Sequence, residues 1–268
     1  MKNKEESSKA KKTDDQWTIK GRGMKIKENK YDDPQFFKEY EKMARSIGGL
    51  EAAGEWPELL KMIPDLQGKR VLDLGCGFGW HCRYAVEKGA KAVVGVDLSA
   101  KMLQVAKAKT ESPLVEYVRM DIADIDCPED AFDLVLSSLV FHYLESFADI
   151  CRRVYHCLVR GGSFIFSVEH PVFTAQGKQE WYCDNEGKPL HWPVDHYFTE
   201  GRRQANFLGK TVTKYHRTLT TYINTLLTYG FAITKLVEPK PAAHLMNEPG
   251  MKDELRRPMM LLVAAEKR

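Results

Sequence analysis

The sequence lacks any apolar run long enough to cross a lipid bilayer. Its longest run, Met259 to Ala265, has seven residues, whereas a membrane-spanning helix needs about 20. No basic segment followed by an apolar stretch marks a secretion signal. The six cysteines include no Cys-x-x-Cys pair and no disulfide-like spacing, which disfavours a zinc ribbon or a disulfide scaffold. These absences predict a cytoplasmic protein with reduced thiols, no membrane contact and no metal.

The sequence also has little net charge, formally +3. Residues 1–30 hold ten Lys or Arg against five Asp or Glu, which leaves the rest of the chain slightly acidic. A folded body without a basic excess gives no reason to expect a nucleic-acid partner. Residues 1–28 are Lys/Glu/Ser-rich and are predicted to be a disordered basic tail. We interpret the tail as a solvated terminus in preference to an arm for an acidic partner.

The middle of the chain alternates short apolar segments with helical patterns. Strands are expected at 71–74, 92–96, 114–118, 132–139 and 163–168, with helices between them. Such alternation favours a parallel sheet covered by helices on both faces. Two glycines at 161–162 are expected to close the helix before the fifth strand. A last unit follows, with a helix at 218–229 and strands at 231–237 and 259–265.

Two further regions flank this α/β core. Asp33 and Pro34 are typical of a helix start, and a second helix is expected at 53–62, so residues 29–64 are predicted to form helices over a ligand site. Residues 65–268 would form the main domain. Within it, residues 171–210 are rich in Trp, Tyr, His and Gly and are interpreted as a lid inserted over the ligand crevice.

A glycine-rich turn follows the first strand of the core. Gly75, Gly77 and Gly79 come directly after Val71 to Leu74, and a helical pattern begins at Trp80. Such a turn lets the backbone approach a ligand closely. The spacing is G-x-G-x-G, which differs from the G-x-G-x-x-G of dinucleotide-binding proteins. Taken alone, it is equally typical of a tight strand-to-helix connection.

Acidic and hydroxyl side chains stand at the ends of the neighbouring strands. Asp97 ends the second strand, 22 residues after Gly75, about where an acid would bind ribose hydroxyls. Asp121 and Ile122 follow the third strand and suit an adenine ring. Because parallel strands end at the same edge of a sheet, these groups are expected to meet in one crevice.

Five segments in order now resemble the motifs of class I S-adenosylmethionine-dependent methyltransferases. They are Val71 to Gly79, Val93-Val-Gly-Val-Asp97-Leu-Ser, Asp121-Ile-Ala, Phe132-Asp-Leu-Val-Leu-Ser-Ser-Leu and Leu158-Val-Arg-Gly-Gly-Ser. The resemblance covers about residues 65 to 170. The whole chain is also similar to bacterial small-molecule methyltransferases of the type 11 group, through Glu169-His-Pro and Tyr215-His-Arg-Thr. That similarity brings no known substrate.

The resemblance implies a doubly wound, mostly parallel seven-stranded sheet with an antiparallel last strand. It implies S-adenosyl-L-methionine as cofactor, with S-adenosyl-L-homocysteine as product. The glycines would approach the methionine part, Asp97 the ribose, and Leu98 and Met102 the adenine. The full set of expected cofactor-binding residues is Asp73, Gly75, Gly77, Gly79, Asp97, Leu98, Met102, Asp121, Ile122 and Ser138.

Two histidines are candidates for a general base, which would help if the acceptor is a phenol, an activated carbon or a protonated amine. His142 stands just past the fourth strand, and its ordinary pKa is about 6.5. A helix-start histidine that binds backbone is the alternative. His170 follows Glu169 at the end of the fifth strand. Adjacent strand residues point to opposite faces, so at most one of Glu169 and His170 is expected to face the crevice.

The expected substrate contacts come from the lid and the N-terminal helix. Aromatic side chains would form a wall over a planar or apolar acceptor, and basic side chains would meet a carboxylate or phosphate. Packing of the lid, or a solvated charge, explains the same residues. The candidates are Tyr40, Trp181, Tyr197, Arg202 and His216.

The sequence therefore predicts a methyltransferase that acts on a small molecule at C, O or N. An NAD-dependent oxidoreductase is disfavoured by the glycine spacing. A nucleic-acid methyltransferase is disfavoured because Ser137-Ser-Leu-Val replaces the Asn/Asp-Pro-Pro-aromatic motif typical of base-modifying enzymes. A non-catalytic cofactor-binding protein stays open, as do the acceptor and the oligomeric state.

Overall fold

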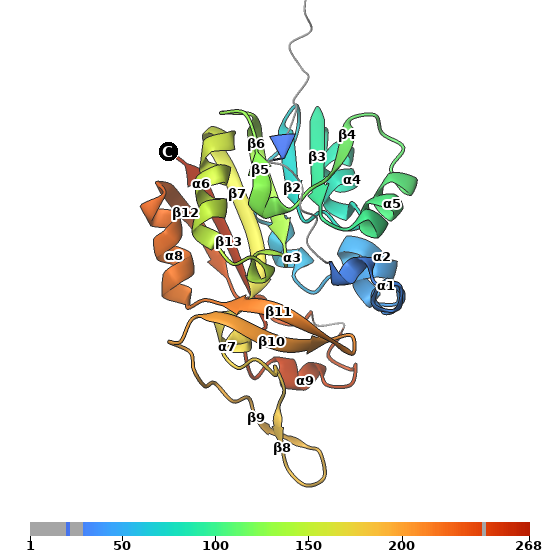
Figure 1. The fold of residues 1–268 in the computed structure, drawn as a ribbon, viewed down its shortest axis with the longest axis vertical. Helices are drawn as coiled ribbons and strands as arrows, with labels where there is room; N and C mark the ends of the chain where they lie inside the picture. Colours follow the sequence, from blue (N-terminus) through green and yellow to red (C-terminus); the bar gives the residue numbers. More distant parts are fainter. Residues whose placement is uncertain (1–19, 22–28, 243–244) are drawn as a thin grey trace, which may run out of the picture.

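A seven-stranded sheet forms the centre of the computed structural model, which describes residues 20–21, 29–242 and 245–268 (Figure 1). The strand order is β12-β13-β7-β6-β2-β3-β4. The strands are β2 Arg70–Leu74, β3 Ala92–Asp97, β4 Val115–Arg119, β6 Phe132–Ser138, β7 Leu158–Glu169, β12 Phe231–Val237 and β13 Met260–Lys267. β13 runs antiparallel to both of its neighbours, while β7, β6, β2, β3 and β4 pair in parallel. The predicted fold, with an antiparallel last strand, is confirmed.

Helices cover both faces of the sheet, as the alternation predicted. α4 (Trp80–Glu87) and α5 (Ala100–Ala108) lie on one face, and α6 (Phe147–Cys157) and α8 (Leu219–Thr228) on the other (Figure 1). Successive residues of β2 show why two cores form, because side chains alternate across a strand. Val71 packs in the core beneath α4 and α5. Leu72 and Leu74 pack in the core beneath α6 and α8.

Side-chain caps fix several helix starts where the sequence placed them. Asp33 accepts a hydrogen bond from the Phe36 amide before α1, and Ser99 accepts one from the Met102 amide before α5. The prediction that the glycines at 161–162 close α6 is wrong. α6 ends at Cys157, and β7 already begins at Leu158 and runs through both glycines. Its pairing with β6 shifts register between Phe132 and Leu134, and this shift accommodates the extra length.

The segments before the sheet gather at the carboxyl ends of its parallel strands (Figure 1). They are η1 Lys30–Asp32, α1 Pro34–Glu41, α2 Ala44–Gly48, η2 Gly49–Ala52 and α3 Trp56–Leu60. The helix expected at 53–62 is thus shorter than predicted. The tail predicted at 1–28 lies outside the described residues, except for β1 (Lys20–Gly21), which pairs antiparallel with β5 (Ile125–Asp126).

The region expected to be a lid forms a short helix and two hairpins. They are α7 Pro171–Thr174, the pair β8 Tyr182–Cys183 and β9 Pro189–His191, and the pair β10 Gly201–Phe207 and β11 Lys210–His216. Leu208 and Gly209 turn the second hairpin, both with positive φ, as tight hairpin turns require. The β10–β11 hairpin lies across the end of the sheet where the parallel strands finish (Figure 1). The remaining short helices are η3 Ile122–Asp124, η4 Phe141–Tyr143 and α9 Met251–Glu254.

Candidate functional site

A cavity of about 1780 Å³ opens at the carboxyl ends of β2, β3, β6 and β7. Its walls come from the sheet, the N-terminal helices, β10–β11 and the segment between β12 and β13. A site for one small ligand typically measures about 300–1,000 Å³. The cavity therefore has room for two ligands side by side.

The glycine turn forms one wall of this cavity. Gly75 and Gly77 line it, with φ of +80° and +51°. A Cβ added at Gly75 would lie 2.3 Å from a methyl carbon of Val140, so no larger residue fits there. Gly79 does not line the cavity. It is the N-cap residue of α4, and a Cβ added there would lie 2.1 Å from the Tyr117 hydroxyl oxygen, so one of the three glycines expected at the cofactor has a structural role instead.

Asp97 stands next to the turn, at the end of β3. Its Oδ2 accepts a hydrogen bond from the Gly77 amide at 2.9 Å, and its Oδ1 accepts one from the Ser99 amide at 2.8 Å. Its low-dielectric surroundings raise the pKa of the Asp97 carboxyl. Each carboxylate oxygen can accept more than one hydrogen bond, so both oxygens keep acceptor capacity toward the cavity.

The other expected cofactor contacts divide into two groups. Five of them line the cavity, as Asp97 does: Leu98, Met102, Asp121, Ile122 and Ser138, the last at the end of β6. Asp73 is the exception and is corrected here. It is 1% exposed, lies beneath the turn, and accepts a hydrogen bond from the Cys82 thiol at 3.4 Å. Burial raises the pKa of Asp73 to about 7, as expected for a structural acid on the α4 face of β2.

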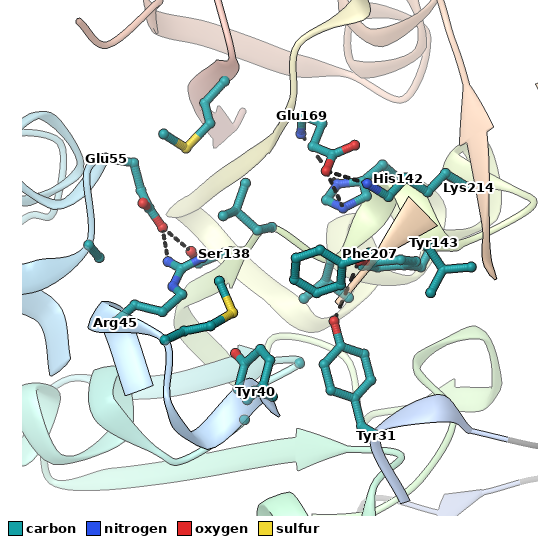
Figure 2. A pocket seen from close by; sticks show the side chains of 18 of the residues that line it. Tyr31, Tyr40, Arg45, Glu55, Ser138, His142, Tyr143, Glu169, Phe207 and Lys214 are labelled. Atoms are coloured by element: carbon teal, nitrogen blue, oxygen red, sulfur yellow. Dashed lines mark hydrogen bonds and ion pairs between the residues drawn. The ribbon is translucent and has the colours of Figure 1, made fainter. Parts of the chain in front are cut away.

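Ser138 belongs to a polar group at the cavity wall. Its hydroxyl donates to Glu55 Oε1 at 3.0 Å, and Glu55 also pairs with the Arg45 guanidinium (Figure 2). Burial alone would raise the pKa of the Glu55 carboxyl, but Arg45 and these hydrogen bonds hold it below its usual value. The N-terminal helices thus bring an ion pair to the cavity that the sequence analysis did not identify.

A second buried ion pair lies at the opposite end of the cavity (Figure 2). Lys214 Nζ is 2.6 Å from Glu169 Oε1 and 2.8 Å from Gln179 Oε1. Gln179 Nε2 in turn donates to Glu169 Oε2 at 2.8 Å. The Lys214 residue is only 2% exposed. Burial would raise the pKa of Glu169, but His142 and the Lys214 ammonium hold it below its usual value.

Aromatic rings separate the two ends of the cavity. Tyr31, Tyr40, Tyr143 and Phe207 line it together with Val140. The Tyr31 hydroxyl lies 3.5 Å from the Tyr143 hydroxyl (Figure 2). Of the five expected substrate contacts, Tyr40 alone lies in this wall. Lys214 Nζ lies 6.0 Å from the centre of the Tyr143 ring and 5.7 Å from that of the Phe207 ring, so the Glu169–Lys214 pair adjoins this aromatic wall.

His142 lines the cavity beside Glu169 but is 2% exposed. Its Nδ1 accepts a hydrogen bond from the Glu169 amide at 3.3 Å, and its Nε2 lies 4.0 Å from Glu169 Oε1. Burial lowers the pKa of His142 to about 4, with Lys214 and Arg217 acting in the same direction and Glu169 against it. A neutral histidine whose acceptor nitrogen already binds backbone is suited to positioning Glu169.

This state of His142 predicts a pH dependence of stability. Between pH 6.5 and about 4 the unfolded chain binds a proton at this position and the folded chain does not, so stability falls as the pH is lowered. The contribution of His142 is up to about 3 kcal/mol. His142→Asn, which keeps an acceptor for the Glu169 amide, is expected to flatten that part of the curve. Urea unfolding from pH 4 to 7 measures it.

His81 serves as an internal reference in this experiment, because burial lowers its pKa to about 4 as well. The variant should therefore keep part of the acid sensitivity and lose the rest. An unchanged pH curve in His142→Asn would show that His142 titrates normally. The expectation of a general base with an ordinary pKa would then regain its support.

His170 does not reach the cavity. Its Nδ1 accepts a hydrogen bond from the Val172 amide at 3.0 Å and caps α7, and its Nε2 lies 2.9 Å from Glu238 Oε1. Glu169, the last residue of β7, lines the cavity, and His170 does not. This agrees with the expectation that at most one of the two faces the crevice. The candidate role of His170 as a base is corrected to that of a helix cap.

Four of the expected substrate contacts also lie outside the cavity lining, and they are corrected here. Their side chains pack or hydrogen-bond within the hairpin region. Arg256 and Arg257 stack on Trp181, the Tyr197 hydroxyl accepts from the Leu219 amide, Arg202 is exposed near Thr213, and His216 binds Thr174 and the Tyr197 carbonyl. The hairpins present Phe207 and Lys214 to the cavity instead.

The sequence of β11 already indicates that Lys214 is buried. Residues 210–216 alternate, and Val212, Lys214 and His216 share the buried face of β11. A lysine on the apolar side of an alternating strand needs a buried partner, and Glu169 provides it. Across the described residues, no three or more His, Cys, Asp or Glu side chains are grouped to hold a metal, and no helix is long and apolar enough to span a membrane.

Comparisons with known proteins agree with this geometry. Residues 72–166 match the family model described as a methyltransferase domain. A protein from Listeria monocytogenes, assigned as an S-adenosylmethionine-dependent methyltransferase, is 61% identical with a TM-score of 0.79, covering 82% of this chain and 99% of that one. An S-adenosylmethionine-dependent methyltransferase from Mesorhizobium loti is 46% identical with a TM-score of 0.76, covering 81% and 100%.

A curated relative with a named substrate matches over a shorter stretch. Trans-aconitate 2-methyltransferase from Rhizobium etli is 30% identical over 158 residues, which is 59% of this chain and 55% of that protein. The match thus spans little more than half of the relative's length.

Proposed function

Because this chain belongs to the class I S-adenosylmethionine-dependent methyltransferases, we propose that it methylates a small-molecule acceptor bound between the aromatic wall and the Glu169–Lys214 pair. One observation carries this proposal. The glycine turn and Asp97 share a single cavity with the aromatic wall and the buried Glu169–Lys214 pair. Cofactor and acceptor would thus meet inside the protein.

The residues at the turn fit S-adenosylmethionine. Gly75 and Gly77 leave their backbone open to the cavity, and the Asp97 carboxylate keeps acceptor capacity for ribose hydroxyls. In our proposal, Leu98, Met102 and Ile122 cover the adenine. Asp121, which is half-buried at the same end, would accept a hydrogen bond from its exocyclic amine.

The cofactor supplies a methyl group on a sulfonium, which a nucleophile displaces in line. The protein's contribution is to hold the acceptor at the required distance and angle and to exclude water, which can lower the barrier by several kcal/mol. Tyr31, Tyr143 and Phe207 would hold a flat or apolar body. Glu169 and Lys214, each fixed by Gln179, would orient its polar group.

The size of the chamber supports a small acceptor. A chamber walled by N-terminal helices, β10–β11 and the β12–β13 segment would hold a small molecule, while a base within a duplex would have to be flipped out to reach it. The relative from Rhizobium etli is named for a small tricarboxylic acid. Lys214 Nζ donates to Glu169 and Gln179. An ammonium has three N–H donors, and in our proposal the remaining one would donate to an oxygen of the acceptor.

A binding screen tests where the acceptor sits. Protein saturated with S-adenosylhomocysteine is titrated calorimetrically with small carboxylates, phenols and amines. A compound that binds wild type is expected to lose about tenfold or more in affinity with Phe207→Ala, because a buried aromatic contact is worth about 1.5–3 kcal/mol. Phe198→Ala is the matched control, since Phe198 is 90% exposed. Equal loss in both variants, or none in Phe207→Ala, would place the acceptor elsewhere.

A further inference from the structure

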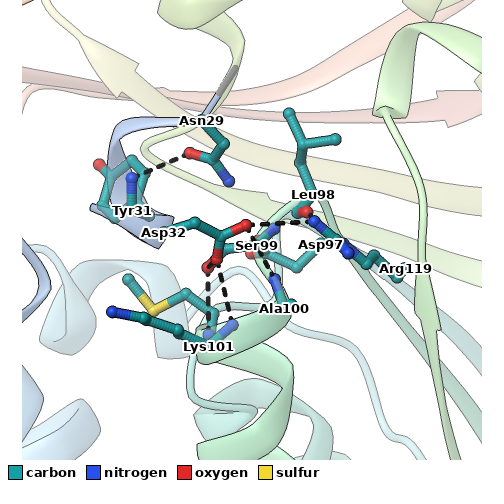
Figure 3. Close-up of polar contacts among 10 residues, drawn as sticks. Asn29, Tyr31, Asp32, Asp97, Leu98, Ser99, Ala100, Lys101 and Arg119 are labelled. Atoms are coloured by element: carbon teal, nitrogen blue, oxygen red, sulfur yellow. Dashed lines mark hydrogen bonds and ion pairs between the residues drawn. The ribbon is translucent and has the colours of Figure 1, made fainter. Parts of the chain in front are cut away.

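A short segment before α1 crosses the end of the cavity where Asp97 lies (Figure 3). This segment, residues 29–32, is called the strap, and it contains η1. Its first three residues, Asn29, Lys30 and Tyr31, line the cavity, whereas Asp32 does not. The strap thus has one side toward the ligand site and one side toward the protein.

Asp32 fastens the strap to the start of α5. Its Oδ1 accepts from the Ser99 hydroxyl at 2.6 Å and from the Lys101 amide at 3.2 Å. Its Oδ2 accepts from the Ala100 amide at 3.4 Å and pairs with Arg119 Nη2 at 3.2 Å (Figure 3). Four donors on one carboxylate make this a charge-assisted clamp.

The groups that hold Asp32 also hold the cavity wall at Asp97. The Ser99 amide donates to Asp97 Oδ1 at 2.8 Å, and Arg119 Nε donates to the Leu98 carbonyl at 3.1 Å. Asp97 and Leu98 both line the cavity. Ser99 therefore links the Asp32 carboxylate to Asp97, the residue proposed to bind the ribose.

α5 does not depend on Asp32 for its cap. The Ser99 hydroxyl already accepts from the Met102 amide at 3.1 Å, which is the ordinary N-cap bond. Asp32 binds two further amides of the first turn, those of Ala100 and Lys101, and it also connects α5 to the strap, since Ser99 and Asp32 are 67 residues apart in sequence.

Tyr31 carries the effect of the clamp into the cavity. Its ring packs edge-on against Tyr40, at 5.3 Å between centroids, and against Tyr143, at 6.4 Å. The Tyr143 ring lies 4.5 Å from the His142 ring between centroids, and His142 lies beside Glu169. Tyr31 therefore stands between the end of the cavity at Asp97 and the end at Glu169.

We propose that Asp32 is a positioning residue that keeps the strap closed over the cofactor and holds Tyr31 as the shared wall of the two ends. The inference rests on the proposed cofactor contacts at Asp97 and Leu98. Its consequence is kinetic, because the strap must detach from Ser99 and Arg119 before a bound nucleoside can leave past Tyr31. Weakening the clamp should speed cofactor release more than it harms the fold.

Dissociation of S-adenosylhomocysteine, measured by surface plasmon resonance on the full chain, tests the proposal. Asp32→Ala is expected to release it about tenfold faster than wild type, since one charged hydrogen bond lost from the closed state has about that effect. Asp32→Asn keeps the shape and loses the charge, so a smaller, severalfold increase is expected.

Asp33→Ala is the matched control. Asp33 is the next residue, and its Oδ1 caps α1 through the Phe36 amide at 2.8 Å, whereas the hydrogen bonds to Ser99, Ala100 and Lys101 come from Asp32. This variant should lose thermal stability without faster release. Equal release rates in wild type and Asp32→Asn would overturn the proposal, even if Asp32→Ala failed to fold. Absence of binding to wild type would instead overturn the cofactor contacts.

Discussion

Asp97→Ala is expected to weaken S-adenosylhomocysteine binding by about 10²- to 10⁴-fold. Each hydrogen bond from a ribose hydroxyl to a carboxylate contributes about 1.5–3 kcal/mol, and the variant loses two. It also releases the Gly77 amide, which Asp97 holds at 2.9 Å, so the glycine turn loses its anchor at the same time. Calorimetric titration of purified protein with S-adenosylhomocysteine measures the effect.

Asp133→Ala separates this effect from a general loss of stability. Asp133 is also a strand carboxylate that accepts a backbone hydrogen bond, from the Arg70 amide at 2.8 Å. It lies at the opposite end of the sheet from the cavity, at the start of β6. Its loss should lower the free energy of unfolding and leave affinity unchanged. Unchanged affinity in folded Asp97→Ala would mean that Asp97 does not contact the cofactor.

The second large effect is expected at the other end of the cavity, where Lys214→Met should lower the free energy of unfolding by about 3–5 kcal/mol. Removing one partner of a buried ion pair leaves the other charge uncompensated. Among the described residues, the side chain of Glu169 would keep Gln179 as its close hydrogen-bond donor. Urea unfolding at pH 7 measures the loss, and the double variant with Glu169→Gln should recover most of it.

The same pair predicts an acid-sensitive component of stability. The folded pKa of Glu169 is below its unfolded value, so the pair contributes fully above the unfolded pKa, and the contribution disappears as the pH falls through the lower folded value. Arg202→Met is the control, since Arg202 is exposed on the neighbouring strand. A change beyond about 0.5 kcal/mol there would be unexpected. A loss below 1 kcal/mol in Lys214→Met would contradict the buried pair.

The residues whose place at the cavity follows from the sequence are local in the chain. Gly75 and Gly77 lie in the turn after β2 and Asp97 ends β3, and parallel strands end at one edge of a sheet. Their placement therefore follows from recognising the strands. Because side chains alternate along a strand, the sequence likewise predicted that Glu169 and His170 would not both face the crevice.

The parts that were wrong depend on contacts distant in sequence. Lys214 meets Glu169 across 45 residues; the alternation of β11 indicates that Lys214 is buried, but it does not indicate which residue Lys214 meets. Trp181 and Tyr197 were placed over the site because the region is aromatic. Their hairpins turn these side chains toward Arg256, Arg257 and the start of α8 instead. Composition identified an insertion there, but only its pairing pattern determines which side chains line the cavity.

Asp73 illustrates a different reason for error. It belongs to the same motif as the glycines, and the resemblance carried it into the cofactor set. The alternation of β2 places it on the α4 face with Cys82, because Leu72 and Leu74 face the other core. Membership of a motif therefore does not by itself indicate contact with the ligand.

Transfer of a labelled methyl group tests the central claim most directly. The purified protein is incubated with S-adenosylmethionine carrying an isotopically labelled methyl group, together with a fractionated cell extract, and the label is followed by mass spectrometry. We predict label in a low-mass product, with at least tenfold less in Phe207→Ala than in Phe198→Ala. Label confined to RNA, DNA or protein, or equal labelling by the two variants, would contradict a small-molecule acceptor bound in this cavity.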